Sequence, residues 1–405
     1  MKNILLISTI YPRPEGNIGT HVCHFFTREW VKMGYGVRAV HIQAVYPRFF
    51  YWLARLAQKK IAAKASAVVY THRENLAVRY EMDNIQVCRI PVFKPIPHWA
   101  FTDKSIKSAE KEIIKFVNET AFEPDIIIGH FPNPQLRLLY DLKKIYPKSK
   151  TCEVLHLPEE LDQLKSVYGK ALPMYMECVD IWGFRFKHLR ELFSECYGKS
   201  KHSFICYSGV PGDYILEGQK QIKDSVSEFI FVGEMIERKF PIKVLDALRQ
   251  SCLDQNFHIN YVGEGSLKQN LIEIVKKEKL EDNVSILGRI PRDSIKKLYD
   301  KADCFIMISK GEAYGLVYLE AMARGCLTIA SRNEGFDGVI VDGVNGFLCK
   351  AGDEYELASI IKRINSLTPE ERQQISDNAI ATAKRLTDYK AAKMYVDDVI
   401  NVYKQ

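Results

Sequence analysis

Two glutamates in the C-terminal half of the sequence have the chemistry and spacing of a binding site. Glu312 lies in a glycine-flanked loop after an apolar strand, Cys304 to Ser309, and Glu320 lies inside an otherwise apolar helix that starts near Gly315. A carboxylate on a core-facing position is costly unless a polar group meets it. The free N–H groups of the helix start form an anion site beside Glu312. The pattern therefore predicts a site for a nucleotide-diphosphate sugar, with phosphates at the helix end and ribose hydroxyls on a carboxylate.

The same segment resembles the E-x7-E region of the retaining group-1 glycosyltransferases (family 4), which have the GT-B fold. The likeness is strong from about residue 228 to 352 and weaker but continuous elsewhere. A lone E-x7-E would favour an ordinary buried helix with one glutamate reaching solvent, but several short sequence motifs match the family at the family's spacing. These motifs are Ser309-x-x-Glu312, Gly315-Leu316-Val317, Leu319-Glu320-Ala321-Met322-Ala323 and Asp342-Gly343-x-Asn345-Gly346-Phe347-Leu348.

The resemblance implies a role for each residue of this segment. Glu312 would sit by the donor sugar, and Glu320 would bind the ribose hydroxyls. Gly315 would open the helix whose N–H groups, at Leu316 and Val317, meet the phosphates. Two further loops match the family less specifically. Gly263, in Val262-Gly263-Glu264-Gly265, would lie near the donor or simply form a turn, and Arg289 would stack on the base or be a plain surface arginine.

A strand and loop from Phe231 to Lys239 resemble the family's phosphate-binding loop. Gly233 and Lys239 match it, but Glu234 stands where the family has an arginine. A glutamate beside a diphosphate repels it. Arg238 can supply the missing positive charge, which is the preferred interpretation, and the alternative is weakened or lost donor binding.

The N-terminal half carries fewer matched residues. Gly19, in the loop after the first strand, corresponds to the glycines that let the family's backbone approach the donor phosphate and the acceptor. His130, at a strand end before Phe131-Pro132-Asn133-Pro134, resembles the family's cleft histidine, which contacts the sugar or assists proton transfer. A strand-end histidine with a structural bond is the alternative. His156 is a weaker candidate of the same kind, for which structure and function are equally expected.

Length and composition bound the class of protein. The chain has 405 residues, which favours two domains over one core, and its hydrophobic content of 47% and charged content of 26% are typical of a globular protein. No apolar stretch is long enough to span a membrane, and the first residues read as a strand rather than a signal peptide. Ten scattered cysteines without a C-x-x-C pair argue against a metal knuckle and for a reducing cytoplasm.

Charge is unevenly distributed along the chain. Residues 1–205 hold 30 Lys and Arg and 20 Asp and Glu, and no acidic residue occurs from Trp30 to Arg73. The basic half suggests an anionic partner, either lipid headgroups, a lipid-linked diphosphate acceptor or, least favoured because no motif supports it, nucleic acid. Within residues 48–60, one helical face would hold Phe49, Trp52, Leu53 and Leu56 and the other Arg48, Arg55 and Lys59. This pattern favours contact with an anionic membrane over a core-packed helix.

Strands and helices alternate through the sequence, which predicts α/β folding with doubly wound sheets. Expected strands in the second half are Phe229–Val232, His258–Val262, Val284–Leu287, Cys304–Ile308 and Leu327–Ala330, and expected helices are Pro241–Ser251, Ser266–Lys277, Arg292–Lys301 and Gly315–Ala323. The resemblance implies a GT-B fold of two Rossmann-like domains facing a central cleft. We expect an acceptor-side domain over residues 1–206, joined by the C-terminal helix at about 388–405, and a donor-binding domain over residues 207–387.

The resemblance implies a retaining glycosyltransferase that moves a sugar from a nucleotide-diphosphate sugar to a lipid-linked or polysaccharide acceptor in surface glycan synthesis. The absence of an Asp-x-Asp motif agrees with a metal-independent site with no cofactor beyond the donor. Its location would be cytoplasmic, with peripheral contact at the inner face of the cell membrane. Two alternatives stay open: a non-catalytic glycosyltransferase-like partner or regulator, favoured by Glu234, and another GT-B activity such as a nucleotide-sugar epimerase.

Overall fold

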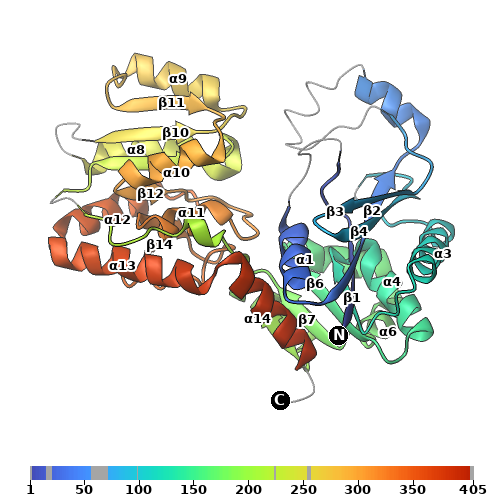
Figure 1. The fold of residues 1–405 in the computed structure, drawn as a ribbon. Coiled ribbons are helices and arrows are strands. Elements are labelled where there is room, and N and C mark those ends of the chain that lie inside the picture. Colours follow the sequence, from blue (N-terminus) through green and yellow to red (C-terminus); the bar gives the residue numbers. More distant parts are fainter. Residues whose placement is uncertain are drawn as a thin grey trace. The chain divides into compact units, whose positions relative to one another are not determined.

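The computed structural model describes residues 2–14, 21–55, 72–97, 99–222, 225–252 and 257–401. This part of the chain divides into two compact units, each with its own sheet (Figure 1). The first unit comprises Met1–Arg185, Leu189–Cys206 and Ala391–Gln405, and the second comprises Phe186–His188 and Tyr207–Lys390. Each unit therefore has its own sheet, with its own strand order.

The first unit is built on an eight-stranded sheet with the order β3-β4-β2-β1-β5-β6-β7-β8. All neighbouring strands are parallel except β3 and β4. The chain lays strands on both sides of β1, so the strand order reverses between β1 and β5. The strands are β1 (Asn3–Ser8), β2 (Gly36–Val45), β3 (Val78–Met82), β4 (Ile85–Phe93), β5 (Ile126–His130), β6 (Lys150–Leu155), β7 (Ile181–Phe184) and β8 (Ser203–Ile205).

Helices cover both faces of this sheet, which explains its continuous apolar strands. Alternate residues of β5 enter different cores: Ile126 and Ile128 join one cluster, and Ile127 joins the other. The helices are α1 (Val22–Lys32), α3 (Asp103–Glu119), α4 (Pro132–Ile145), α5 (Glu159–Tyr168), α6 (Leu172–Met176), α7 (Lys187–Tyr197) and α14 (Asp388–Ile400), with residues 48–55 also helical.

The C-terminal part of α14 packs into the core of the first unit. Trp30 of α1 is fully buried, and its indole Nε1 donates a hydrogen bond to the carbonyl of Ala392 at 2.8 Å. The ring of Tyr395 meets the ring of Trp30 edge to face, with centroids 5.1 Å apart. Aromatic contacts and a satisfied indole thus fix the end of the chain on this unit.

The second unit is built on a six-stranded parallel sheet with the order β11-β10-β9-β12-β13-β14. Here the chain moves outward from β9 to β11 and then places β12 on the other side of β9. The reversal point therefore lies between β9 and β12. The strands are β9 (Glu228–Val232), β10 (His258–Val262), β11 (Val284–Gly288), β12 (Cys304–Ile306), β13 (Leu327–Ser331) and β14 (Phe347–Cys349).

The helices of the second unit have recognisable start signals. Thr368 and Glu371 form a capping box, in which the Thr368 hydroxyl accepts from the Glu371 N–H at 3.2 Å and the Glu371 carboxylate accepts from the Thr368 N–H at 2.8 Å. Asp353 caps the preceding helix in a similar way. The helices are α8 (Pro241–Ser251), α9 (Lys268–Lys277), α10 (Arg292–Lys301), α11 (Leu316–Ala323), α12 (Glu354–Ser366) and α13 (Pro369–Arg385).

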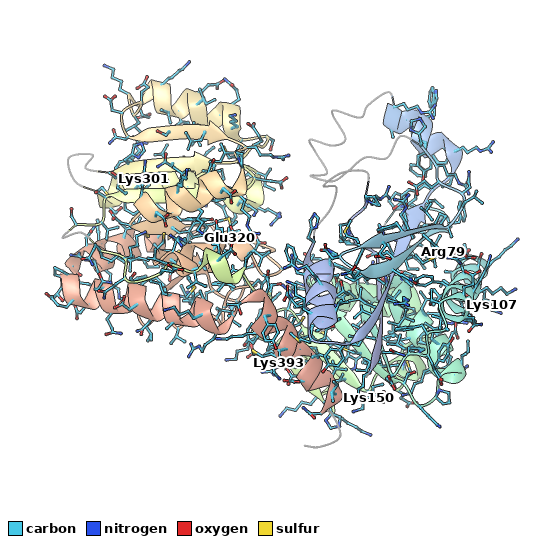
Figure 2. All side chains as sticks on the ribbon, in the orientation of Figure 1. Arg79, Lys107, Lys150, Lys301, Glu320 and Lys393 are labelled. Carbon is cyan, nitrogen blue, oxygen red and sulfur yellow. The ribbon has the colours of Figure 1, made fainter. Side chains whose placement is uncertain are left out.

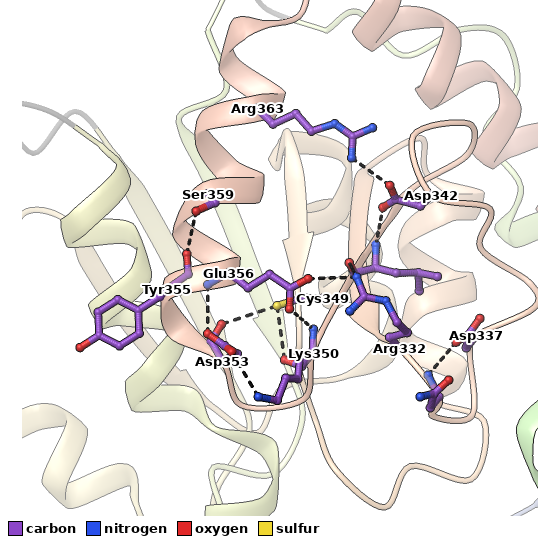
Figure 3. A network of polar contacts seen from close by, with 12 residues as sticks. Arg332, Asp337, Asp342, Cys349, Lys350, Asp353, Tyr355, Glu356, Ser359 and Arg363 are labelled. Carbon is purple, nitrogen blue, oxygen red and sulfur yellow. Dashed lines mark hydrogen bonds and ion pairs between the residues drawn. The ribbon is translucent and has the colours of Figure 1, made fainter.

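A network of paired charges holds β14 and α12 together at one edge of this sheet (Figure 3). Glu356 accepts from the Arg332 guanidinium at 2.9 Å and from the Lys350 N–H at 2.8 Å. Arg363 pairs with Asp342 at 2.8 Å. Such exposed pairs contribute little to stability, so they provide suitable control positions for substitutions elsewhere in the unit.

The predicted fold class is confirmed, and most predicted elements lie within one to three residues of the observed ones. The sequence analysis did not predict the antiparallel pair β3 and β4. Asp83 and Asn84, which join them, have φ values of 50° and 61°. Two adjacent left-handed residues are typical of a tight hairpin turn, and Asp-Asn between apolar runs was an available signal. The predicted strand Cys304–Ile308 ends at Ile306, although Met307 and Ile308 remain buried.

The described ranges contain neither a membrane-spanning helix nor a cluster of metal-binding side chains. None of their helices is both long and apolar enough to cross a membrane. In the same part of the chain, no group of three or more His, Cys, Asp or Glu side chains is arranged to hold a metal ion.

Candidate active site

The reversal point between β9 and β12 brings two predicted site residues together. Lys239 ends a short 3-10 turn after β9 (Glu237–Lys239), and Glu312 follows β12. Their Nζ and Oε2 atoms are 3.2 Å apart, and only 12% and 15% of the two side chains is exposed. In open parallel sheets, ligands bind where the strand order reverses, at the carboxyl ends of the strands. The ion pair occupies that position.

Arg238 reaches the same loop from the neighbouring position. Its Nη1 donates to the carbonyls of Lys310 and Gly311 at 3.4 and 3.3 Å and lies 3.9 Å from Glu312 Oε2. Lys310 returns a backbone hydrogen bond to the Arg238 carbonyl at 2.8 Å. The two loops are therefore joined by backbone and side-chain contacts, with two cations and one carboxylate at the junction.

The loop that carries Glu312 is held rigidly. The Glu312 N–H donates to the Glu334 carboxylate at 2.9 Å, and the Glu312 carbonyl accepts from the Gly335 N–H at 2.8 Å. Gly315, with φ of 77°, begins α11, and a Cβ there would lie 2.4 Å from the ring of Tyr318. The Tyr318 hydroxyl is buried and donates to the Met307 carbonyl at 2.9 Å. These contacts fix the start of α11, with Leu316 and Val317 in its first turn, beside Glu312.

Two glycine loops lie next to Lys239 at the ends of β9 and β10. A Cβ on Gly263, which has φ of 142°, would lie 1.9 Å from the carbonyl oxygen of Gly233. A Cβ on Gly233 would in turn meet Lys239 Nζ at 3.3 Å. Only glycine allows such a close approach of two backbones without strain. The predicted residues Gly233, Gly263 and Lys239 thus belong to one tightly packed region.

Glu320 lies on α11 and is 7% exposed (Figure 2). Its Oε1 accepts from both Nε and Nη2 of Arg292, at 3.0 and 2.6 Å. Burial raises the pKa of the Glu320 carboxyl above its ordinary value, and the Arg292 charge opposes that rise. Arg292, whose guanidinium lies 5.2 Å from the ring centre of Tyr214, was absent from the sequence-based predictions. Its position at the start of α10 was visible in the sequence, but its partner was not.

Glu234 and Arg289 are the predicted site residues with the fewest side-chain contacts to the rest of the site. Across the described ranges, no side-chain hydrogen bond or ion pair joins Glu234 to another residue. Glu234 is half-buried, beside Gly233 in the same loop. Arg289 is exposed and follows β11, which is two strands away from β9. The structure therefore brings Arg238, Lys239 and Glu312 together and Glu320 with Arg292. It places Arg289 directly after Gly288, whose carbonyl accepts from the Gly263 N–H at 2.8 Å.

His130 ends β5, beside β1, at the reversal point of the first unit. It is fully buried, and its Nδ1 and Nε2 lie 2.9 Å from His156 Nε2 and 3.1 Å from the Tyr395 hydroxyl. Burial, with a smaller effect of Arg185, lowers the pKa of His130 to about 3. A sugar contact by His130 stays a prediction, and it would require one of these two bonds to break.

Two carboxyl groups are buried near this histidine pair. Glu160 accepts from the His156 N–H at 2.7 Å, and burial raises its pKa to about 8. Neither oxygen of Glu153, which is fully buried, has a hydrogen-bond partner among the described residues. Burial, reinforced by the nearby Glu160, raises the pKa of Glu153 well above its ordinary value. Burial therefore disfavours the charged form of both carboxyl groups. Gly19 lies outside the described residues.

Comparison with known proteins agrees with this geometry. Residues 215–382 match the model of the family "Glycosyl transferases group 1". N-acetyl-alpha-D-glucosaminyl L-malate synthase of Bacillus anthracis is 30% identical over 138 residues, which are 34% of this chain and 36% of that protein. The lipopolysaccharide core biosynthesis glycosyltransferase LpsE of Rhizobium meliloti is 26% identical over 155 residues, 37% of this chain and 40% of that one. The chain thus spans well under half the length of these curated relatives.

Solved structures resemble the whole chain. Sucrose-phosphate synthase from Thermosynechococcus elongatus superposes with a TM-score of 0.67 at 14% identity, covering 99% of this chain and 98% of that one. Anabaena HepE in complex with UDP gives a TM-score of 0.66 at 16% identity, covering 99% and 100%. At such identities the likeness shows the fold alone. Residues 215–382 therefore belong to the group 1 glycosyl transferase family, within a chain that has the GT-B fold.

Proposed function

We propose that the chain is a retaining glycosyltransferase that moves a sugar from a nucleotide-diphosphate sugar to a lipid-linked or polysaccharide acceptor. The observation that carries the proposal is the Lys239–Glu312 pair, 3.2 Å apart at the β9/β12 reversal point, inside the segment that matches the family. Lys239 is a cation that could meet the diphosphate leaving group, and Glu312, which holds it beside the start of α11, could lie next to the sugar.

The chemistry follows from where charge develops. When the sugar leaves the donor, negative charge grows on the β-phosphate, and fixed cations and N–H groups stabilise that charge. In the proposal, Lys239 and Arg238 supply the cations, and the N–H groups of Leu316 and Val317 point at the phosphates. Glu312 lies by the sugar ring. No metal or further cofactor is assigned a role.

Glu320 is proposed to bind the donor ribose. Both bonds from Arg292 go to Oε1 of Glu320. A ribose hydroxyl would therefore donate to Oε2, while Arg292 keeps the carboxylate ionised and oriented despite burial. This assigns Arg292 a positioning role that the sequence did not indicate.

The acceptor class is inferred from the relatives and from the charge of the chain. The relatives include a lipopolysaccharide core biosynthesis and an amylovoran biosynthesis glycosyltransferase, and the basic N-terminal half fits an anionic acceptor. We assign transfer to a surface glycan on that basis, with the enzyme working at the cytoplasmic side of the cell membrane.

The test is turnover of nucleotide-sugars by the purified full-length protein, starting with UDP-glucose, with and without a lipid extract or oligosaccharides as acceptor. The proposal expects nucleoside diphosphate release that depends on acceptor, and an anomeric NMR signal in the product of the same configuration as the donor. An inverted anomer would contradict retention. Conversion of the donor without acceptor would indicate an epimerase, and no turnover with any donor would indicate the non-catalytic alternative.

A further inference from the structure

The helix over residues 48–55 presents its apolar side chains outward. Phe49 is 56% exposed, Trp52 is 62% exposed and Leu53 is also exposed, whereas Tyr51 and Ala54 are buried on the other side. The Tyr51 hydroxyl accepts from the Tyr46 N–H at 3.1 Å, which seats the helix just beyond β2 (Figure 1, the blue helix without a label). A surface helix normally buries its aromatic residues. This one is attached through Tyr51 and Ala54 and leaves Phe49, Trp52 and Leu53 exposed, although the centroids of the Phe49 and Phe50 rings lie 4.2 Å apart.

A second exposed apolar segment lies at the same edge of the sheet. Trp99 is 65% exposed, and Ile96 is exposed as well. This segment follows β4, which is the parallel neighbour of β2, and the Lys94 N–H donates to the Val45 carbonyl at 2.8 Å where the two strands end. The Trp99 carbonyl accepts from Asn133 Nδ2 at 3.1 Å, at the start of α4. Phe49, Trp52, Leu53, Ile96 and Trp99 are here called the aromatic rim.

Exposed arginines flank the helix of the aromatic rim. Arg48 and Arg55, on the same helix, are exposed. Residues 1–100 contain 14 Lys and Arg against 5 Asp and Glu, and the stretch from Trp30 to Arg73 has eight basic residues and no acidic one. Exposed aromatics flanked by arginines are the composition that settles at a lipid headgroup layer, where rings lie at the interface and cations meet anionic lipids.

We propose that the aromatic rim is a docking surface for an anionic lipid bilayer. The rings of Phe49, Trp52 and Trp99 insert at headgroup depth, and Arg48 and Arg55 pair with lipid phosphates. A bilayer fits better than a protein partner because the aromatic rim comes from two separate segments beyond strand ends. Its helix carries two exposed arginines and lies in a stretch, Trp30 to Arg73, without acidic residues. This inference goes beyond the proposed function, because it concerns the first unit alone and holds with or without transferase activity.

The test is flotation of the full-length protein with vesicles of phosphatidylcholine alone or mixed with phosphatidylglycerol. We expect binding to the mixed vesicles, and a fall of roughly tenfold or more in the partition coefficient for Phe49→Ser/Trp52→Ser. Arg48→Ala/Arg55→Ala should fall by roughly tenfold on the mixed vesicles only. The matched control is Tyr355→Ser/Tyr389→Ser, which removes two exposed aromatics of the second unit and should bind as wild type.

Fluorescence adds a readout at the aromatic rim itself. Trp30 and Trp182 are buried, so in a Trp99→Phe variant the only exposed indole among the four tryptophans is Trp52. Its emission should shift to the blue on the mixed vesicles. Absence of flotation, equal flotation of Phe49→Ser/Trp52→Ser, or a wild-type dimer that this variant abolishes would each overturn the proposal, the last by assigning the surface to a second copy. An unchanged thermal transition shows that the variants fold.

Discussion

The two units have the same plan at their reversal points but treat polar groups in opposite ways. Between β9 and β12, Lys239 and Glu312 form a partly exposed ion pair, with 12% and 15% of their side chains exposed. Between β1 and β5, His130 is fully buried, and both ring nitrogens are bonded to neighbours. Residue types that could do chemistry occur in both places. Burial decides which of them can meet a ligand without rearrangement.

The pKa shifts express the same contrast. In the first unit burial lowers the pKa of His130 to about 3 and raises that of Glu160 to about 8, so burial disfavours the charged form of both side chains. In the second unit, Glu320 is also buried, but Arg292 opposes the rise in its pKa. A buried carboxylate with a cation partner can act on a ligand as an anion, whereas one without such a partner serves mainly the packing.

The largest expected effect comes from removing the cation at the β9/β12 reversal point. Lys239→Met keeps the apolar stem beside Met307, whose Sδ lies 3.8 Å from Nζ, but removes the charge. Loss of one group that stabilises developing charge lowers kcat by about 10²–10³-fold. Steady-state kinetics with the donor that the turnover test selects would measure it.

Lys243→Met is the matched control for that substitution. Lys243 is a more exposed lysine of the same unit that pairs with Glu354 at 3.1 Å. It should change kcat less than about threefold, as expected for a surface pair. Equal losses in the two variants would show that the charge of Lys239 has no special position, and the contrast between the two units would fail.

A second substitution tests the tight glycine loops of the second unit. Gly263→Ala combines a φ of 142° with a Cβ 1.9 Å from the Gly233 carbonyl oxygen, and should lower the free energy of unfolding by about 3 kcal/mol. Gly311→Ala has φ of 68° but nothing within 4 Å, so it should cost about 1 kcal/mol. Gly212→Ala has neither feature and should be neutral. Scanning calorimetry would rank the three, and a stable Gly263→Ala would contradict the close approach.

The smallest effect concerns the buried carboxyls of the first unit. Because the pKa of Glu160 is raised from 4.5 to about 8, the folded protein keeps a proton that the unfolded chain loses. Stability therefore falls as pH rises through that window, by up to about 1.4 kcal/mol per pH unit for this group. Glu160→Gln should remove this part of the slope between about pH 7 and pH 8, where ordinary histidines are mostly deprotonated.

All four tryptophans lie in the first unit, so urea unfolding followed by their fluorescence would measure this slope. Glu159→Gln, at the exposed neighbouring residue, is the control and should keep it. Glu153, whose pKa is also raised, should leave a remaining slope of the same sign in both variants. An identical pH profile for wild type and Glu160→Gln would show that Glu160 is ionised when folded.

The second unit was predictable because its local signals agree with its topology. The strands β9, β10 and β11 are short apolar runs that end at or directly before a glycine, so strand ends and loop residues such as Gly263 could be placed from the sequence. Glu312 could be placed because it follows the apolar run from Cys304 to Ser309. The environment of His130 could not, because its bond to Tyr395 joins residues 265 positions apart. Arg292 was missed for a related reason, since nothing local indicates that it meets Glu320.

Nucleotide binding in the second unit tests the central claim most directly. A thermal-shift screen with nucleoside diphosphates would compare wild type, Glu320→Ala and the control Glu356→Ala, which removes an ion-paired glutamate at the far edge of the same sheet. A ligand at about 100 times its dissociation constant adds roughly 2.7 kcal/mol to stability. We expect a shift with one nucleotide in wild type and Glu356→Ala, and its loss in Glu320→Ala. No shift with any nucleotide, or an equal shift in all three proteins, would contradict a donor site built on Glu320.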